Sequence, residues 1–257
     1  MDSKKAMKIL VVLMILVNLI MAGYIISLAV SQSQQRIDNK YIMSILEYRG
    51  ITLECDIDNS STPVFKLKHT DDVNDEVYQY LLLRDGVTTR SDDGMVITFI
   101  PAVTQRYENI DLDTAEVIAR DFMEALPVEQ NPYVLDYRQT TGVGTYSFQF
   151  NFYDSNSYIY DKYVKIQVSK NGIIEAVIGS ISYEVENSGY TASDISIGNI
   201  LVSNFTRQGI SQMVLRKIDS GYLYIKETGQ IEAVWRVLYN ENQVRYFLTK
   251  DGEEVIR

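Results

Sequence analysis

The chain has 257 residues, 46% of them hydrophobic, so it can form one large domain or two smaller ones with a real core. Its formal net charge at pH 7 is −10, and an acidic chain repels phosphate backbones, so no nucleic-acid partner is expected. With one Cys and one His, it cannot form an intramolecular disulfide, a zinc site of the usual ligand spacing or a site that needs two imidazoles.

The N-terminal segment decides the predicted compartment. Residues 9–30 carry no charged side chain, and three lysines precede them. About 20 apolar residues are enough to span a bilayer as a helix, and the positive flank stays in the cytoplasm. We therefore expect a cytoplasmic tail over residues 1–8, a single transmembrane helix over 9–30 and an extracytoplasmic remainder in the cell membrane.

A cleaved signal peptide is the alternative for this segment. Ser27 and Ala29 form a small-x-small pair of the kind that precedes a cleavage site. The apolar regions of signal peptides span about 7–15 residues, and this one is longer, which favours a retained helix.

Asn18 lies in the middle of the predicted membrane helix. Its side-chain amide can hydrogen-bond to another helix, a contribution of about 1 kcal/mol or less. The alternative is that a long apolar helix simply tolerates one amide. Asn18 is the candidate transmembrane helix contact that the sequence offers.

A stalk and an N-terminal α+β section are predicted for residues 31–107. A polar stretch over 31–40 leads into a short helix around 42–46, and Gly50 suits the end of that helix. Further along, we expect a helix over 74–83 and strands over 51–57, 64–68 and 95–101.

A helix followed by an antiparallel sheet is predicted for residues 108–187. Asp111 can cap the helix, because apolar side chains recur on one helical face directly after it. The stretch TYSFQFNFY alternates apolar and polar residues, which is typical of a half-buried antiparallel strand. The stretch YVKIQVSKNGIIEAVIG predicts two strands joined by an Asn-Gly turn.

The same order of elements returns 80 residues later, in residues 188–257. The stretch VKIQVSKNG aligns with VRYFLTKDG at that constant offset, and Thr191 takes the capping position before a helix over 192–207. Strands are expected over 231–239 and 243–249, with Trp235 as a core anchor. The two copies predict a repeated helix-plus-sheet unit.

The sequence gives little support for an enzyme. His69 follows a predicted strand near Asp71 and Asp72, without a Ser or Cys signature, so a solvated loop position is favoured over a catalytic base. Cys55 is expected to be a small buried residue. The acidic pairs lack the spacing of a calcium loop. We therefore predict no catalytic, cofactor-binding or metal-binding residues, no cofactor and no small-molecule substrate.

Both ends of the sequence resemble the YycI family. The start, MDSKKAMKILVVLMILVNLIMA, resembles the family's Met-Asp-Trp-Ser-Lys opening and apolar helix, although the Trp after Asp2 is absent. The stretch ILEYRGITLECDI resembles the family's early helix and strand. The ending, with SGYLY, AVWRVLY and RYFLTKDGEEV, resembles the ending shared by YycI, its sister YycH and PepSY-like domains.

This resemblance implies an α+β fold in which an N-terminal transmembrane helix precedes extracytoplasmic, PepSY-like repeats. It implies a membrane-anchored, non-enzymatic regulatory protein of the WalK–WalR two-component system, which controls cell-wall metabolism. The implied partners are a YycH-like sister protein and a sensor histidine kinase. The alternative function is a PepSY-like inhibitor of an extracytoplasmic peptidase, or a peptide-binding module.

Overall fold

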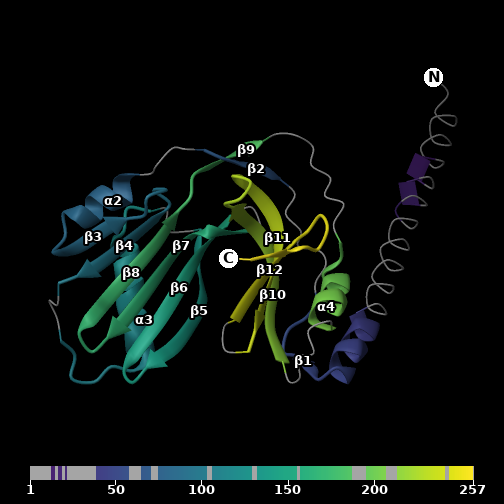
Figure 1. Ribbon diagram of the computed structural model, residues 1–257, viewed down its shortest axis with the longest axis horizontal. Helices are drawn as coiled ribbons and strands as arrows, with labels where there is room; N and C mark the ends of the chain where they lie inside the picture. The colour runs from purple at the N-terminus through teal and green to yellow at the C-terminus, as the bar shows by residue number, and fades with distance from the viewer. Residues whose placement is uncertain are drawn as a thin grey trace, which may run out of the picture. The chain divides into compact units, whose positions relative to one another are not determined.

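Figure 1 shows the computed structural model of the chain. It describes residues 13, 14, 17, 18, 21, 39–57, 65–70, 75–102, 106–128, 132–154, 157–186, 195–206, 213–240 and 243–256. The chain divides into unit 1, residues 1–57 and 197–215, and unit 2, residues 58–196 and 216–257. We describe each unit by itself.

Unit 1 combines helices with a short strand pair. Residues 39–48 are helical, and Gly50, with a φ of 77°, ends the helix as the sequence predicts. Strand β1 (Ile51–Leu53) then pairs in parallel with Met213–Leu215, the start of β10 (Met213–Ile225). Helix α4 (Ile197–Thr206) approaches the first helix so closely that a Cβ on Gly198 would lie 2.1 Å from the Cδ1 atom of Ile42.

Unit 2 is built on a mixed, mostly antiparallel sheet with the order β13-β12-β11-β10-β7-β8-β4-β3, and β6 and β5 extend it from β7. A separate two-stranded sheet joins β2 and β9. The bounds are β2 (Lys66–His69), α2 (Asp75–Leu82), β3 (Gly86–Arg90), β4 (Val96–Pro101), α3 (Leu112–Ala125), β5 (Tyr133–Gly142), β6 (Thr145–Asp154), β7 (Ser157–Ser169), β8 (Gly172–Ser180), β9 (Tyr183–Glu186), β11 (Gln230–Tyr239), β12 (Gln243–Leu248) and β13 (Glu254–Val255).

Strand β7 is the branch point of this sheet because two strands share one of its edges. Antiparallel β8 pairs with Lys162–Ser169, whereas parallel β10 pairs with only two residues, Tyr158 and Ile159. At this junction Gly221 opposes Tyr158, and a Cβ on Gly221 would lie 2.4 Å from the Tyr158 carbonyl oxygen. The absence of a side chain at Gly221 therefore lets β10 approach β7.

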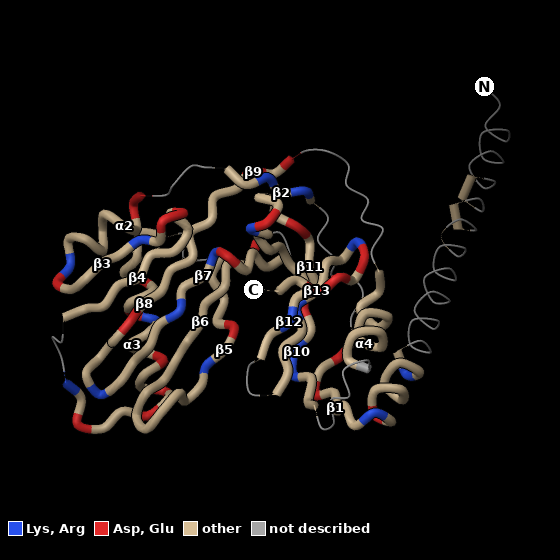
Figure 2. Tube along the Cα trace, viewed as in Figure 1, with Lys and Arg blue, Asp and Glu red and all other residues tan. Residues whose placement is uncertain are grey.

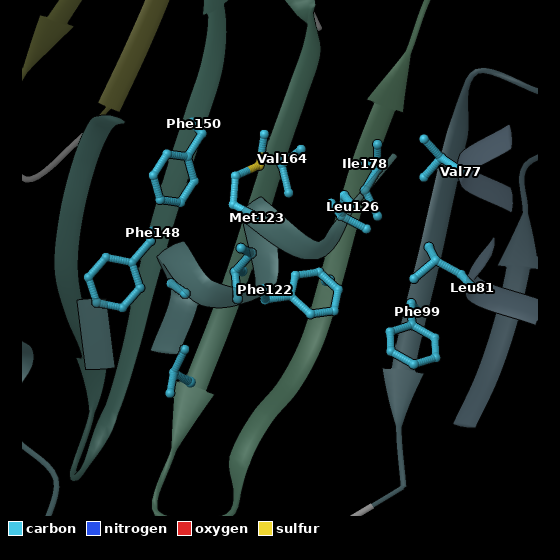
Figure 3. Packing of buried hydrophobic residues seen from close by; sticks show 14 of the residues in the cluster. Val77, Leu81, Phe99, Phe122, Met123, Leu126, Phe148, Phe150, Val164 and Ile178 are labelled. Carbon is cyan, nitrogen blue, oxygen red and sulfur yellow. The ribbon is translucent and has the colours of Figure 1, made fainter. Parts of the chain in front are cut away.

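Helices α2 and α3 cover one face of the β4–β8–β7–β6 part of the sheet. Asp111 caps α3, since its Oδ1 atom accepts a hydrogen bond from the Thr114 N–H at 2.8 Å, which confirms the predicted cap. Figure 3 shows Phe122 and Met123 of α3 packed against the sheet, together with Phe99 of β4. Burial of this apolar face is the main stabilising contribution to the unit.

The alternating face predicted for the stretch TYSFQFNFY is only partly correct. Phe148 and Phe150 join the core under α3, but Phe152 packs in a different cluster, with Leu67 and Tyr222. The register between β6 and β7 shifts between Asn151 and Phe152, so the side chains beyond this point face a different direction. The alternation itself contains no signal for this irregularity.

The helix predicted over 192–207 begins later than expected. Helix α4 starts at Ile197, after two described residues that are not helical. The predicted cap, Thr191, lies outside the described residues. The N–H of Ile195 instead donates to the Thr249 carbonyl oxygen at 2.9 Å, which keeps this segment out of the helix. The predicted strands over 231–239 and 243–249 are confirmed as β11 and β12.

The observed fold class is α+β, as predicted, although the sheet is mixed rather than purely antiparallel. No helix within the described ranges is both long and apolar enough to cross a membrane. Most of the helix predicted over 9–30 lies outside those ranges. The repeat boundaries at 108–187 and 188–257 stay a prediction.

The β7–β10 junction gives a test of the fold. We expect Gly221→Ala to lower the free energy of unfolding by about 1–3 kcal/mol, because the new methyl group would overlap the Tyr158 carbonyl. Gly142→Ala is the matched control, since no atom lies within 4 Å of a Cβ built there. Urea unfolding followed by circular dichroism measures both variants. Equal midpoints for the two would contradict the close approach.

Candidate functional site

A cluster of charged side chains lies where β5, β10 and β11 come together in unit 2. It consists of Asp136 on β5, Lys217 and Asp219 on β10, and Arg236 on β11, and we call it the charge cluster. The side chains of Asp136 and Arg236 are only 1% and 2% exposed, whereas that of Lys217 is 35% exposed. Charged positions interrupt the traces of β5 and β10 in Figure 2. The cluster is thus deeply buried and meets solvent at Lys217.

The Arg236 guanidinium is bidentate to both carboxylates. Its Nη1 and Nη2 atoms donate to Asp136 at 2.6 and 2.8 Å, and its Nε and Nη2 atoms donate to Asp219 at 2.7 and 2.5 Å. Lys217 Nζ also donates to Asp136, at 2.7 Å. Two cations and two anions are therefore matched, with the fork geometry that makes Arg–carboxylate pairs strong.

Local backbone geometry brings Asp136 into the cluster. The register between β5 and β6 shifts between Leu135 and Tyr137, so Asp136 occupies a bulge and has no β6 partner. A bulge changes the direction of a side chain relative to a regular strand, in which side chains alternate between the two faces. Arg236 lies on β11 between Trp235 and Val237, and so points to the opposite face of that strand.

The pKa values of the cluster follow from this pairing. Burial alone would raise the pKa of the Asp136 carboxyl, but hydrogen bonds and charge from Arg236 and Lys217 outweigh it and hold that pKa below its usual value. Burial would lower the pKa of Lys217, but Asp219 and Asp136 raise it above its usual value. Asp136 and Lys217 are therefore ionised at neutral pH.

Tyrosines surround the charged groups. The Tyr160 hydroxyl donates to Asp219 at 2.7 Å, and Arg236 lies 4.6 Å from the centre of the Tyr160 ring. Burial, together with the Asp219 charge, raises the pKa of Tyr160 well above its usual range. Because the Asp136 carboxyl is ionised and Lys217, Arg236 and Tyr160 keep their protons, these four groups do not supply a general acid or base near pH 7. We interpret it as a structural clamp.

The structure places Asn18 on a helical segment with its side chain exposed. Its Nδ2 atom donates to the Met14 carbonyl oxygen, one turn earlier, at 3.0 Å. The sequence favours a solvated loop position for His69. In the structure, His69 is instead the last residue of β2 and is half-buried. Its Nδ1 atom lies 3.0 Å from the Ser182 carbonyl oxygen, and its ring centre lies 4.8 Å from that of Tyr224.

Other singled-out residues have simple structural roles or lie outside the described ranges. Trp235 is a buried core residue, as predicted. Cys55 is half-buried rather than buried, with its Sγ atom 3.7 Å from the Leu215 carbonyl oxygen. Asp71 and Asp72 fall outside the described residues. Within those residues, no group of three or more His, Cys, Asp or Glu side chains is arranged to hold a metal ion.

Sequence reasoning missed the charge cluster. The alternation AVWRVLY places Arg236 on the opposite face of the strand from Trp235, which the sequence predicts to be a core residue. The apolar Val234 and Leu238 beside it are the available signal that the second face of β11 is also buried. The partners Asp136 and Asp219 lie far from Arg236 in sequence, so no spacing connects them.

Unit 2 also contains open pockets. One of about 470 Å³ lies between β2 and the start of β11, and is lined by Leu67, His69, Tyr222 and Ile231, among others. Another, of about 500 Å³, is lined by Phe152, Lys162 and Tyr183, among others, and Lys162 Nζ lies 3.8 Å from the centre of the Phe152 ring.

Comparison with known proteins does not assign the chain to a family. No family model and no curated protein matches it. Among solved structures, it is similar to an uncharacterized protein from Eubacterium rectale, with 11% sequence identity and a TM-score of 0.48. The match covers 81% of this chain and 91% of that one. A likeness this distant carries no argument about function.

The charge cluster gives a stability prediction. We expect Arg236→Met to lower the free energy of unfolding by about 3–5 kcal/mol, because it leaves buried carboxylates with too few partners. Arg138→Met on the same sheet is the matched control. Arg138 pairs with Asp113 and Glu116 at the surface, so its loss should change stability little. Urea unfolding measures both, and equal effects would contradict the clamp.

The same cluster predicts a pH dependence. Since the pKa of Asp136 is lowered in the folded state, its stabilising contribution is present above the unfolded pKa of about 3.9 and is lost as the pH falls through the folded value. Asp136→Asn should therefore flatten the fall in unfolding free energy below about pH 4 relative to the unmodified protein. Parallel curves for the two proteins from pH 5 to 2 would rule out this contribution.

Proposed function

We propose that the protein is a membrane-anchored, non-enzymatic regulatory protein. It binds a YycH-like partner and a sensor histidine kinase, and it modulates two-component signalling that controls cell-wall metabolism. Residues 9–30 form its transmembrane helix, with the N-terminus in the cytoplasm and the folded part outside.

The observation that carries this proposal is an exposed apolar stretch at the N-terminus. Leu13, Met14, Val17 and Met21 are helical, and each is between 49% and 61% exposed. Covering a large apolar side chain contributes about 1.5–3 kcal/mol, so a helix of this kind is stabilised by lipid or by another helix. The uncharged sequence around these residues and the lysines before them support the same orientation.

Asn18 adds a specific contact to this apolar helix. Its Nδ2 atom donates to the Met14 carbonyl oxygen at 3.0 Å, and its side chain is exposed. A carbonyl oxygen on an apolar helix can accept a hydrogen bond from a donor on a neighbouring helix. Asn18 therefore selects the rotation of this helix against a partner helix that offers a donor.

The charge cluster supports a role in binding rather than in chemistry. Its carboxylates and cations are saturated by one another, and they brace β5 against β10 and β11. A braced outer part can hold a partner at a fixed geometry. Regulation then requires that the protein binds two states of the kinase with unequal affinity, because equal affinity shifts no equilibrium.

Co-purification from native membranes tests this function. We expect the tagged full-length protein to retain a sensor histidine kinase in mild detergent, and we expect deletion of the protein to change output from that kinase. Asn18→Leu should weaken retention by roughly fivefold, since a membrane hydrogen bond contributes about 1 kcal/mol.

Met21→Leu is the matched control, because it keeps an apolar side chain on the same helix and should leave retention unchanged. Kinase output that is identical with and without the protein would refute the proposal. Equal retention by the Asn18 and Met21 variants would refute only the role of Asn18.

A further inference from the structure

A pocket of about 450 Å³ lies beside the end of α2 in unit 2. It is lined, among others, by residues 83–85 directly after α2, by Ile118 and Phe122 of α3, and by Phe99 and Ile173 of the sheet. Its volume falls in the range of small-molecule sites, about 300–1,000 Å³. We call it the α2–α3 pocket, and we propose that it binds a free α-amino acid with an apolar side chain.

The inner part of the α2–α3 pocket is apolar. The rings of Phe99 and Phe122 lie nearly parallel, with their centres 6.2 Å apart (Figure 3). Both residues are buried, whereas Ile118 and Ile173 are half-buried and Leu83 is 89% exposed. An apolar side chain that enters the pocket would cover these partly exposed residues, and the hydrophobic effect favours that burial.

Two consecutive residues of opposite charge, Arg84 and Asp85, also line this pocket. Both are exposed, and neither forms an ion pair with any residue in the described part of the chain. Arg84 repels a cationic ligand and Asp85 repels an anionic one, so a ligand with a single charge gains from one residue and loses from the other. A ligand that carries one charge of each sign is attracted by both.

Aromatic rings hold the Arg84 guanidinium at the mouth of the pocket. It donates a hydrogen bond to the Tyr80 hydroxyl and lies 4.6 Å from the centre of the Tyr80 ring. It also lies 5.9 Å from the centre of the Phe122 ring, which lines the pocket. A guanidinium has five N–H donors in a planar fork, so Arg84 can in addition hold a carboxylate by two hydrogen bonds.

Backbone contacts fix the position of Asp85. Its carbonyl oxygen accepts a hydrogen bond from the Ala102 N–H at 3.0 Å. The next residue, Gly86, has a φ of 153°, and a Cβ there would lie 2.8 Å from the Cε2 atom of Phe99. The absence of a side chain at Gly86 therefore lets the chain after Asp85 lie against the Phe99 ring. Asp85 is held next to the apolar part of the pocket, where its carboxylate can accept hydrogen bonds from an ammonium group.

An apolar α-amino acid combines the three features that the pocket selects. Its carboxylate pairs with Arg84, its ammonium group pairs with Asp85, and its side chain enters between Ile118 and Phe122. A longer peptide fits less well, because its two charged ends lie on different residues and only one of them can reach this pair.

This inference goes beyond the proposed regulatory function. It depends on unit 2 alone and requires no membrane helix, no sister protein and no kinase. Failure of either proposal therefore leaves the other in place.

Nuclear magnetic resonance of the full-length protein in mild detergent, with isotope-labelled isoleucine methyl groups, tests the pocket. The probe is L-leucine at millimolar concentration. We expect the methyl signals of Ile118 and Ile173 to shift until the site is saturated. The signal of Ile166, which is fully buried and does not line the pocket, should stay in place. No shift at Ile118 and Ile173, or an equal shift at Ile166, would overturn the proposal.

Two analogues of leucine separate charge recognition from apolar binding. Isocaproate keeps the side chain and the carboxylate but lacks the ammonium group, and isoamylamine keeps the side chain and the ammonium group but lacks the carboxylate. We expect each to bind roughly tenfold more weakly than leucine, because each loses one charge-assisted contact. Equal affinity for all three compounds would overturn the proposal, since the pocket would then recognise only the apolar group.

Substitutions at the two charged positions provide the matched test in the protein. Arg84→Gln should weaken leucine binding roughly tenfold without weakening isoamylamine binding, because isoamylamine has no carboxylate to lose a partner. Asp85→Asn should weaken leucine binding to a similar extent without weakening isocaproate binding. Both residues are exposed, so the fold tolerates these changes.

Arg120→Gln is the control for the loss of one positive charge. Arg120 is an exposed residue of α3 that pairs with Glu116 and lies 5.6 Å from the centre of the Phe150 ring, outside the pocket. We expect it to leave leucine affinity unchanged. Unchanged leucine affinity in both the Arg84 and Asp85 variants, or an equal loss in the Arg84 and Arg120 variants, would overturn the proposal.

Discussion

The charge cluster is the interaction on which the arrangement of unit 2 depends. Parallel pairing between β7 and β10 involves only two residue pairs, so backbone hydrogen bonding alone joins the two parts of the sheet weakly. Arg236 compensates by holding Asp136 of β5 and Asp219 of β10 at once. Buried pairs of this kind contribute little net stability relative to an apolar core, but breaking one is costly. The cluster therefore specifies one arrangement of the strands rather than adding bulk stability.

Irregular backbone positions make that arrangement possible. The bulge at Asp136 turns an acidic side chain toward β11, the register shift after Asn151 moves Phe152 into a second apolar cluster, and Gly221 allows β10 to approach β7. Each of these three positions departs from regular strand geometry, and each allows a contact between two parts of unit 2.

Two features of the described residues differ sharply in their exposure. The N-terminal helical residues expose large apolar side chains, whereas the charge cluster is buried and its charges are paired with one another. The exposed side chains suit a hydrophobic environment, and the charge cluster specifies how β5, β10 and β11 lie together.

The sequence alone determined the local elements with strong signals. Asp111 as a helix cap, the turn at Asn171-Gly172, the helix end at Gly50 and the strand around Trp235 follow from short-range propensity and spacing, and the structure confirms each. It did not determine the charge cluster or the parallel β7–β10 pairing. The charge cluster joins residues as far apart in sequence as Asp136 and Arg236, which are 100 positions apart. Only the tertiary structure brings such residues together, because their contact energy depends on chain topology, and local pattern does not encode it.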